Sequence, residues 1–542
     1  MPTLRELTDD LIRQEQTLRQ GGGEDGQQRQ LRHGRLPVRA RLDLLLDKDR
    51  PFFELGLWAA DGMYQEWGGV PAAGIVTGIG FVADRACLIA ANDATVKAGA
   101  MFPQSVKKLL RAQKIAAQFR LPLIYLVDSA GVFLPLQDEI FPDEDDFGRI
   151  FRNNAVLSAA GIPQYAAVMG NCVAGGGYLP VLCDKMLMTD GSQLCLAGPA
   201  LVKAAIGQVV DPEELGGASM HAAISGTVDF HEADDPSCLK RLRALVDLLP
   251  PNIPPGTLDN AASDHHASDH HASDNHASDN QVYDIVSADG RDEYDVRDLL
   301  RCLVDEHTLQ EYKAEFGQTL VTAFAKIAGY PIGIVANQKR RCRTASGEIQ
   351  VGGVIYPDAA DKAARFVMDC NQTKLPLLFI QDVQGFMVGK QAEQAGIIRA
   401  GAKLVNVVSN SVVPKFTVIV GGSFGAGHYA MCGKAYDPAL ILAWPSAKYA
   451  VMGGNQAAET LLSLQLRDAQ RAGRTLCENE VAELRQSIQK RYQEQTDIRF
   501  GAARGWVDAI IPPADTRLWL QTALTLLPPS TNREFKTGVL QV

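Results

Sequence analysis

Two glycine-rich stretches contain the residues of this sequence that are best suited to chemistry. GNCVAGGGYLP covers residues 170–180, and GGSFGAGHYAM covers residues 421–431. A turn of small residues between a strand and a helix lets backbone N–H groups point at a ligand. Such a turn could bind a phosphate, or it could stabilise the oxyanion that forms when a thioester becomes an enolate. Alternatively, glycine is present only because a Cβ would prevent close packing of helix on strand.

Side chains in and near these stretches suggest other chemistry. GGSFG matches the GxSxG nucleophile motif, with Ser423 at its centre. A hydrolase of that type needs a histidine later in the chain, and the last histidine is His428, inside the turn itself. We therefore expect Ser423 to have no histidine partner for a triad. Asp128 and Asp382 each end an apolar run, where either a general base or a turn-forming aspartate could stand.

The two stretches belong to an internal repeat. IPQYAAVMGNCVAGGGY matches VPKFTVIVGGSFGAGHY, and upstream LPLIYLVDSAGVF matches LPLLFIQDVQGFM, which pairs Asp128 with Asp382. Further upstream, IAAND at 89–93 matches IVANQ at 334–338. The matched segments follow one another in the same order in both copies, and the number of residues between partners changes little. We interpret the chain as two homologous halves.

Each half alternates short apolar runs with helical patterns, such as the helix expected over 105–119. This alternation predicts α/β domains with mainly parallel strands. The predicted boundaries are an N-terminal domain over 1–255, a low-complexity His/Asp linker over 256–282 and a C-terminal domain over 283–542. The linker histidines could bind a transition metal, but a solvated spacer is the simpler interpretation. A charged helical pattern over 456–495 favours packing or assembly.

Composition limits the class of protein. The 542 residues carry a net charge of −10 and no long basic run, which argues against a nucleic-acid partner. The ten cysteines are scattered without CxxC pairs, as in a reduced, cytoplasmic protein, and no metal site is expected. The N-terminal segment is polar and helical, and no apolar run is long enough for a membrane span.

Longer segments carry a family resemblance: ANDATVKAGAMFP (91–103), AGPALVKAAIGQVVDPEELGGASMH (197–221), QDVQGFMVGKQAEQAGIIRAGAK (381–403) and GGSFGAGHYAMCGKAYDP (421–438). On these segments the sequence resembles the carboxyltransferase (β) subunits of biotin-dependent acyl-CoA carboxylases. Residues 134–164 are similar to the methylcrotonyl-CoA carboxylase β-subunit branch. Two departures leave the acyl substrate open. Residues 129–132 replace a Gly-Gly-Ala turn that most of that branch has, and residues 339–353 form an extra loop.

The resemblance implies a fold and a mechanism. The fold is α/β, with two tandem crotonase-like (ClpP/crotonase) domains related by internal duplication. Acyl-CoA would lie on the N-terminal half of one subunit and carboxybiotin on the C-terminal half of its dimer mate. In this family, CO₂ released from carboxybiotin is attacked by the thioester enolate after biotin removes the α or vinylogous γ proton. Two oxyanions develop, so two pockets of amide donors would lower the barriers.

The resemblance also implies site residues. The amides of Gly175 and Gly176 would bind the thioester oxygen, and those of Ala426 and Gly427 the ureido oxygen of biotin. An alignment of glycine-rich turns can shift by one residue, so neighbouring alternatives are Ala174, Gly177, Gly425 and His428.

Further candidates concern the two ligands. The loop of Ala94, Thr95 and Lys97 would approach the CoA adenine. Phe386 and Met387 would lie on the biotin side, although core packing also explains them. Three basic residues could either meet the CoA phosphates or lie on a solvated helix face: Lys107, Lys108 and Arg111.

The implied reaction moves CO₂ from carboxybiotin to 3-methylcrotonyl-CoA or a related branched or short acyl-CoA. The chain has neither an ATP-grasp glycine loop nor an AMKM-type biotinylation motif. The implied partners are a biotin carboxylase and biotin carrier subunit, acyl-CoA, and further copies in a homo-oligomer, a hexamer built from dimers. Alternatives are a glutaconyl-CoA type decarboxylase, acetyl-, propionyl- or geranyl-CoA as substrate, and an inactive scaffold subunit, which the intact glycines disfavour.

Overall fold

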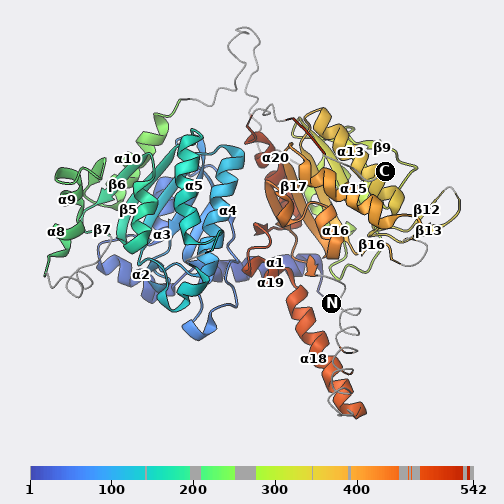
Figure 1. The fold of residues 1–542 in the computed structure, drawn as a ribbon, viewed down its shortest axis with the longest axis horizontal. Helices are drawn as coiled ribbons and strands as arrows, with labels where there is room; N and C mark the ends of the chain where they lie inside the picture. Colours follow the sequence, from blue (N-terminus) through green and yellow to red (C-terminus); the bar gives the residue numbers. More distant parts are fainter. Residues whose placement is uncertain are drawn as a thin grey trace, which may run out of the picture. The chain divides into compact units, whose positions relative to one another are not determined.

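The computed structural model describes residues 2–140, 143–195, 209–250, 276–344, 346–388, 392, 394–450, 462, 466, 477–528 and 534–537. The chain divides into two compact units (Figure 1). The N unit comprises Ile12–Pro255 and Ala502–Gly505. The C unit comprises Met1–Leu11, Gly256–Gly501 and Trp506–Val542. Most of the His/Asp tract and of the predicted helical segment before residue 477 lies outside the described residues.

The N unit is built on a mixed sheet in the order β1-β2-β3-β4-β5-β6-β8, and β7 pairs with β5. The first three strands are antiparallel, and the pairs from β3 onward are parallel. The strands are β1 (Phe53–Leu55), β2 (Ile75–Val82), β3 (Arg85–Asn92), β4 (Leu123–Ser129), β5 (Gln164–Val173), β6 (Lys185–Thr189), β7 (Gln193–Cys195) and β8 (Phe230–Glu232).

The C unit repeats this sheet. Its order is β20-β18-β17-β15-β11-β10-β9, and β19 pairs with β17 as β7 pairs with β5. The duplicated α/β fold predicted from the internal repeat is therefore confirmed. The strands are β9 (Gln310–Tyr312), β10 (Leu320–Ile327), β11 (Tyr330–Asn337), β15 (Leu377–Val383), β17 (Lys415–Phe424), β18 (Leu440–Ala443), β19 (Lys448–Ala450) and β20 (Ala509–Ile510).

Helices pack on the sheet of the N unit because alternate strand residues point to opposite faces. Ile89, Ile124 and Ala167 form a core with helices α3 (Val38–Leu45) and α10 (Asp235–Asp247). Residues of the other parity face α4 (Pro103–Phe119) and α5 (Phe147–Ala159), and α4 is the helix predicted over 105–119. In the C unit, α13 (Pro357–Gln372) and α15 (Ile397–Asn410) pack together in a corresponding apolar core.

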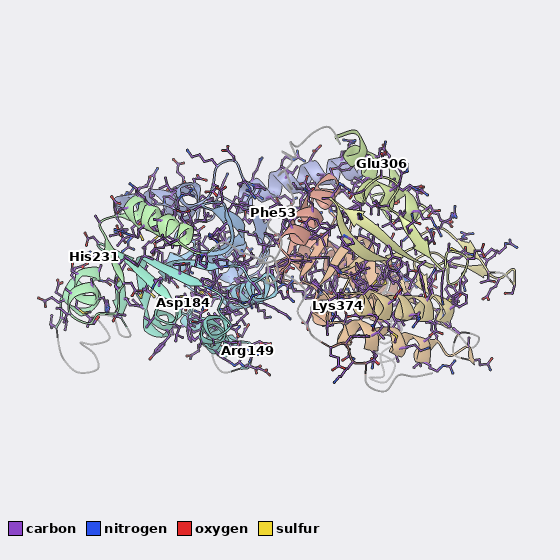
Figure 2. The ribbon with its side chains drawn as sticks, turned by 90° about the horizontal axis from the view of Figure 1, so that it is seen from above. Phe53, Arg149, Asp184, His231, Glu306 and Lys374 are labelled. Carbon is purple, nitrogen blue, oxygen red and sulfur yellow. The ribbon has the colours of Figure 1, made fainter. Side chains whose placement is uncertain are left out.

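The start of β5 is fixed by Asp184. One carboxylate oxygen accepts the backbone N–H of Gln164 at 2.8 Å, and the other accepts the hydroxyl of Ser158, at the end of α5. Figure 2 labels Asp184 among the side chains of the N unit. These contacts hold β5 at the end opposite to its glycine-rich turn.

Two segments differ from simple loops. The extra loop over 339–353 contains a two-stranded hairpin of β12 (Cys342–Arg343) and β13 (Ile349–Gln350). Helix α11 (His276–Ile285) begins inside the predicted linker, so the last part of that linker is helical. Other elements of the two units are α1 (Leu4–Leu18), α2 (Gly23–Arg32), η5 (Ala174–Gly177), α6 (Tyr178–Val181), β16 (Gly385–Phe386), α16 (Gly425–Ala430) and α18 (Glu478–Thr496).

Candidate functional site

The first glycine-rich turn follows β5 directly as the short helix η5, and α6 comes next. A Cβ added to Gly176 would meet nothing within 4 Å, whereas one added to Gly177 would lie 3.2 Å from Leu194. Close packing therefore does not explain the glycine at 176. The open space at this residue is compatible with a ligand that approaches the backbone.

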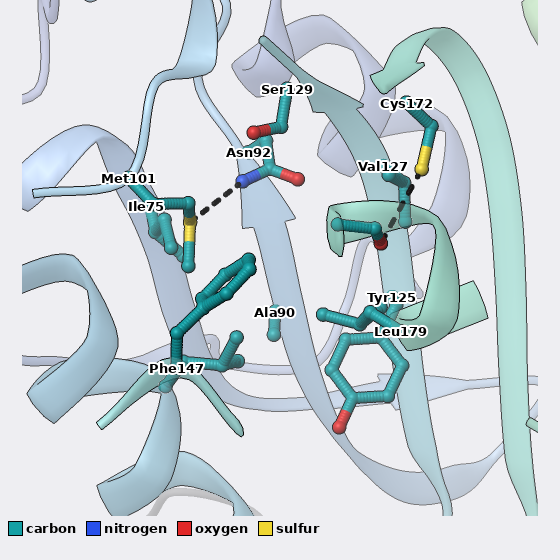
Figure 3. Close-up of a pocket in the computed structure, with 12 residues that line it drawn as sticks. Ile75, Ala90, Asn92, Met101, Tyr125, Val127, Ser129, Phe147, Cys172 and Leu179 are labelled. Atoms are coloured by element: carbon teal, nitrogen blue, oxygen red, sulfur yellow. Dashed lines mark hydrogen bonds between the residues drawn. The ribbon is translucent and has the colours of Figure 1, made fainter. Parts of the chain in front are cut away.

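Gly176 lines a narrow, mostly apolar cavity of about 30 Å³ in the N unit (Figure 3). The wall is formed by the ends of the central strands together with α4, α5 and α6. Its lining residues are Ile75, Ala90, Asn92, Met101, Leu109, Tyr125, Val127, Ser129, Phe147, Cys172, Gly176 and Leu179.

Hydrogen bonds fix two parts of this wall. The Tyr125 hydroxyl donates to Asn154 at 2.7 Å and accepts from Gln113 at 3.0 Å, so the ring is held beside the cavity. The Cys172 thiol donates to the carbonyl of Gly176 at 3.6 Å, and burial raises the pKa of this thiol to about 12. Cys172 is thus a neutral thiol that ties the turn to β5.

The loop predicted to approach the CoA adenine is partly covered. Ala94 and Thr95 are each 6% exposed, and their carbonyl oxygens accept hydrogen bonds from Gln30 and Arg29 of α2. Lys97 is exposed and has a left-handed φ of 47°. A ligand could reach this loop at Lys97, and the predicted adenine contact stays a prediction.

Lys108 does not fit either interpretation made from the sequence. Its ammonium group is buried and donates to the carbonyls of Ala72 and Ile75, at 3.0 and 2.5 Å. Burial lowers the pKa of Lys108 to about 7. This side chain is committed to the backbone around β2, so the hypothesis that it binds phosphate is wrong. Lys107, one residue earlier, is exposed.

The second glycine-rich turn joins β17 to α16. By helix geometry, the N–H groups of Ala426 and Gly427 in the first turn of α16 have no partner within the helix. A Cβ added to Gly427 would lie 2.5 Å from Val383, so close packing does explain this glycine. Gly425 has a φ of +56°, which favours glycine. These positions are compatible with amide donors, and that role stays a prediction.

Ser423 does have a histidine partner, contrary to expectation. His428 Nδ1 lies 2.7 Å from Ser423 Oγ, and the serine hydroxyl donates to Gln381 at 2.6 Å. The Tyr449 hydroxyl lies 2.5 Å from His428 Nε2. This contact was not expected because the GxSxG motif takes its histidine from later in the chain, whereas α16 turns a neighbouring histidine back onto β17.

This cluster is not a hydrolase site. Ser423 is fully buried, and its proton is committed to Gln381, so the hydroxyl oxygen accepts Nδ1–H of His428. Nε2 of His428 then accepts from Tyr449. Burial lowers the pKa of His428 to about 4, which agrees with a neutral ring. The cluster ties the second turn to β15, β17 and β19.

The two residues predicted for the biotin side, Phe386 and Met387, lie in different surroundings. The Phe386 ring packs against the core of the C unit, where a Cβ on Gly401 would lie 3.1 Å from it. Met387 lines a cavity of about 1030 Å³ between the hairpin and the start of α13. That volume is ample for a bicyclic ring. Among the described residues that line it, none belongs to the second turn, so this cavity and the proposed ureido donors are separate features of the C unit.

The described residues contain neither a candidate metal site nor a candidate membrane span. Within the described part of the chain, no group of three or more His, Cys, Asp or Glu residues is arranged to hold a metal ion. None of the described helices is both long and apolar enough to cross a membrane.

Sequence reasoning missed most of the cavity wall. Met101, Phe147 and Leu179 lie in segments quoted for the repeat or the resemblance, but none of them was predicted to line a site. They meet only because three separate helical or loop segments cover one face of the sheet. Asn92 could have been noticed, because the internal repeat places it opposite Asn337.

Comparisons with known proteins agree with this architecture. A family model described as "Carboxyl transferase domain" matches residues 29–537. The biotin-dependent 3-methylcrotonyl-coenzyme A carboxylase beta1 subunit of Mycobacterium tuberculosis is 44% identical, over 96% of this chain and 94% of that protein. A probable mitochondrial methylcrotonoyl-CoA carboxylase beta chain of Drosophila melanogaster is 41% identical, over 96% and 89%.

A solved structure gives the same result in three dimensions. The β subunit of geranyl-CoA carboxylase from P. aeruginosa superposes with a TM-score of 0.84 at 32% identity, over 99% of this chain and 96% of that one. The chain therefore belongs to the carboxyl transferase family, as the carboxyltransferase component of a biotin-dependent acyl-CoA carboxylase.

Proposed function

We propose that this chain carboxylates a short, branched acyl-CoA, with 3-methylcrotonyl-CoA as the first candidate. The supporting observation is the narrow apolar cavity that has Gly176 in its wall. A thioester whose oxygen lies at the amides of Gly175 and Gly176 would direct its acyl group towards this cavity, whose volume of about 30 Å³ favours a small group. The fixed ring of Tyr125 and the side chains of Phe147 and Leu179 limit the acyl length. The M. tuberculosis and D. melanogaster relatives are named for the same substrate.

The chain's part in the reaction is electrostatic. Biotin, held on a separate carrier subunit, supplies the carboxyl group. Amides at the first turn would stabilise the thioester oxyanion, and amides of Ala426 and Gly427 would stabilise the ureido oxygen. The apolar wall excludes water from the enolate. Each oxyanion would therefore meet preorganised donors rather than a titrating side chain.

We also propose that the active site forms between two copies of the chain, within a homo-oligomer built from dimers. The support is the duplicated fold, which supplies two equivalent turns for two reactants. The compartment stays a prediction of the sequence, since relatives named as mitochondrial are among the matches.

An acyl-CoA panel tests the substrate. The chain is purified with its biotin-carrying partner, and labelled bicarbonate fixation is measured with acetyl-, propionyl-, 3-methylcrotonyl- and geranyl-CoA. We expect the highest kcat/KM with 3-methylcrotonyl-CoA. Equal or better use of geranyl-CoA would contradict the proposed limit on acyl length.

A variant connects that result to the cavity. Leu179→Ala should widen the cavity and raise the relative rate with the longer acyl groups. Val181→Ala is the matched control, because Val181 lies on the same helix, is 46% exposed and is absent from the cavity lining. If the preference between acyl chain lengths changed in both variants, or in neither, the acyl group would not bind in this cavity.

A further inference from the structure

Both glycine-rich turns are held by a buried aspartate on the neighbouring strand. Asp128 is the penultimate residue of β4 and accepts the backbone N–H of Asn171 on β5 at 3.2 Å. Asp382 lies near the end of β15 and accepts the N–H of Gly422 on β17 at 2.9 Å. Asp128 is 2% exposed and Asp382 is 1% exposed. The same contact therefore stands in the same place in both halves.

The first glycine of each stretch makes room for this carboxylate. A Cβ added to Gly170 would lie 2.1 Å from the carboxyl group of Asp128, and one added to Gly421 would lie 2.5 Å from that of Asp382. Contacts this short do not occur between real atoms, so these two glycines are required by the aspartates.

The backbone of each aspartate is held as well. Its N–H donates to the side-chain oxygen of an asparagine, Asn92 at 3.4 Å in the N unit and Asn337 at 3.2 Å in the C unit. The parallel pairing between the two strands shifts register at each aspartate. The aspartate thus joins the strand before it, its own strand and the strand that leads into the turn.

A cation compensates each buried carboxylate. Arg41, itself 1% exposed, lies 3.2 Å from Asp128 and donates to the carbonyl of Met169 at 2.9 Å. Lys339 lies 2.9 Å from Asp382. A carboxylate taken out of water needs such pairing and hydrogen bonding to remain charged. The two cations come from unrelated positions in the halves, although the anions are equivalent.

We propose that Asn92, Asp128 and Arg41, and likewise Asn337, Asp382 and Lys339, are positioning residues that form one brace per half and direct the amides of the glycine-rich turn that follows. Asn92 also lines the cavity proposed for the acyl group, whereas Asp128 and Arg41 are absent from its lining. The brace fixes the last residues of β5 and β17, from which η5 and α16 begin. The effect of the brace on catalysis rests on the proposed function, whereas its effect on the position of the turns does not.

Hydrogen–deuterium exchange of the intact protein tests the brace without an activity assay. Asp128→Asn should raise amide exchange in peptides covering 170–181, and Asp382→Asn should raise it in those covering 421–431. The matched controls are carboxylates that bind backbone N–H groups away from the turns. Asp47→Asn serves the N unit, where Asp47 binds Ala83 and Arg243, and Asp508→Asn serves the C unit, where Asp508 binds Ile441 and Lys434. Unchanged exchange in the turns, or the same increase in the controls, would overturn the proposal.

A second pair of variants covers the case in which an aspartate variant does not fold. Lys339→Arg keeps the cation and should keep the protection of 421–431, whereas Lys339→Met should lose it. Loss of this protection in both variants, or in neither, would contradict the proposal that Lys339 holds the second turn. In turnover, a displacement of about 1 Å in the donors should lower kcat by about a hundredfold with little change in KM. If the turns loosen as expected but the wild-type protein transfers no carboxyl group, the proposed function fails and the brace stands.

Discussion

At single positions in the two turns, glycine is required for different physical reasons. Gly170 and Gly421 leave room for buried carboxylates, and Gly427 lets α16 pack against Val383. Gly176 has open space where its Cβ would be. The choice between packing and amide donation therefore has to be made residue by residue. Gly176 is the position where an added side chain can test the approach of a ligand to the backbone without clashing with the protein.

We predict that Gly176→Ala folds normally and turns over slowly. The added methyl group meets no protein atom, so the melting temperature should hardly change. It would project beside the thioester, and we expect kcat/KM for the acyl-CoA to fall about tenfold or more. Gly148→Ala, in α5, is the matched control because its Cβ also meets nothing. Normal turnover of Gly176→Ala would mean that the thioester does not approach this residue.

His428 predicts a pH dependence of stability. Its pKa is about 4 in the folded chain and 6.5 ordinarily, so the unfolded chain binds the extra proton between these values. Stability should therefore fall as the pH drops from about 6.5 towards 4, by about 2 kcal/mol at pH 5 from this group alone. The variant His428→Asn lacks that proton site.

Urea unfolding at about pH 7.5 and pH 5 measures this effect. Between the two pH values, the free energy of unfolding of the wild-type chain should fall by about 2 kcal/mol more than that of His428→Asn. An equal loss in both would show that His428 is not held neutral by burial. The network could not be foreseen from the sequence, because Tyr449 reaches the ring from another strand.

At the scale of elements, α2 covers the loop after β3. Cβ atoms at Gly22 and Gly26 would lie 2.0 and 2.9 Å from Thr95 atoms, so this helix approaches the loop closely through glycine. The Gly22 N–H donates to Thr95 Oγ1 at 2.9 Å. The position of the loop thus depends on α2.

We predict that Gly22→Ala displaces the loop and weakens recognition of the nucleotide part of CoA. KM for acyl-CoA should rise about fivefold or more, whereas KM for the corresponding acyl-pantetheine, which has no adenine, should hardly change. Gln27→Ala, on the exposed face of α2, is the control. An equal rise in KM for both substrates would show that the adenine does not bind at this loop.

Local elements were the most predictable part of this fold. The strand and helix of each repeat follow from periodicity, as α4 and the matched strands β4 and β15 show. Contacts between distant segments were not predictable. Arg41 lies 87 residues from Asp128, and no local pattern links a helix near the start of the chain to the end of β4. The cavity wall depends on packing of the same kind.

At the scale of the whole molecule, the repeat has become two sheets with the same strand order and the same aspartate brace. The sequence predicted this duplication because register was kept over long segments. It could not specify which acyl group the first unit accepts, since that depends on the volume left between side chains.

A mixing experiment tests whether the active site is shared between chains. Gly176→Ala impairs the first turn, and Ala426→Pro removes one proposed donor of the second at a helix start that tolerates proline. If each site combines the first turn of one chain with the second turn of its mate, oligomers reassembled from equal amounts should regain about a quarter of wild-type activity. Activity no higher than the average of the two variants would place both turns in one chain's site.

The most direct measurement of the central claim is carboxyl transfer by the purified chain alone. The chain is incubated with free biotin and 3-methylglutaconyl-CoA that carries a labelled carboxyl group, in the reverse direction of the proposed reaction. We expect label in carboxybiotin, formed in proportion to enzyme and reduced at least tenfold by Gly176→Ala and by Ala426→Pro. Absence of labelled carboxybiotin with the folded wild-type chain, or undiminished transfer by both variants, would contradict it.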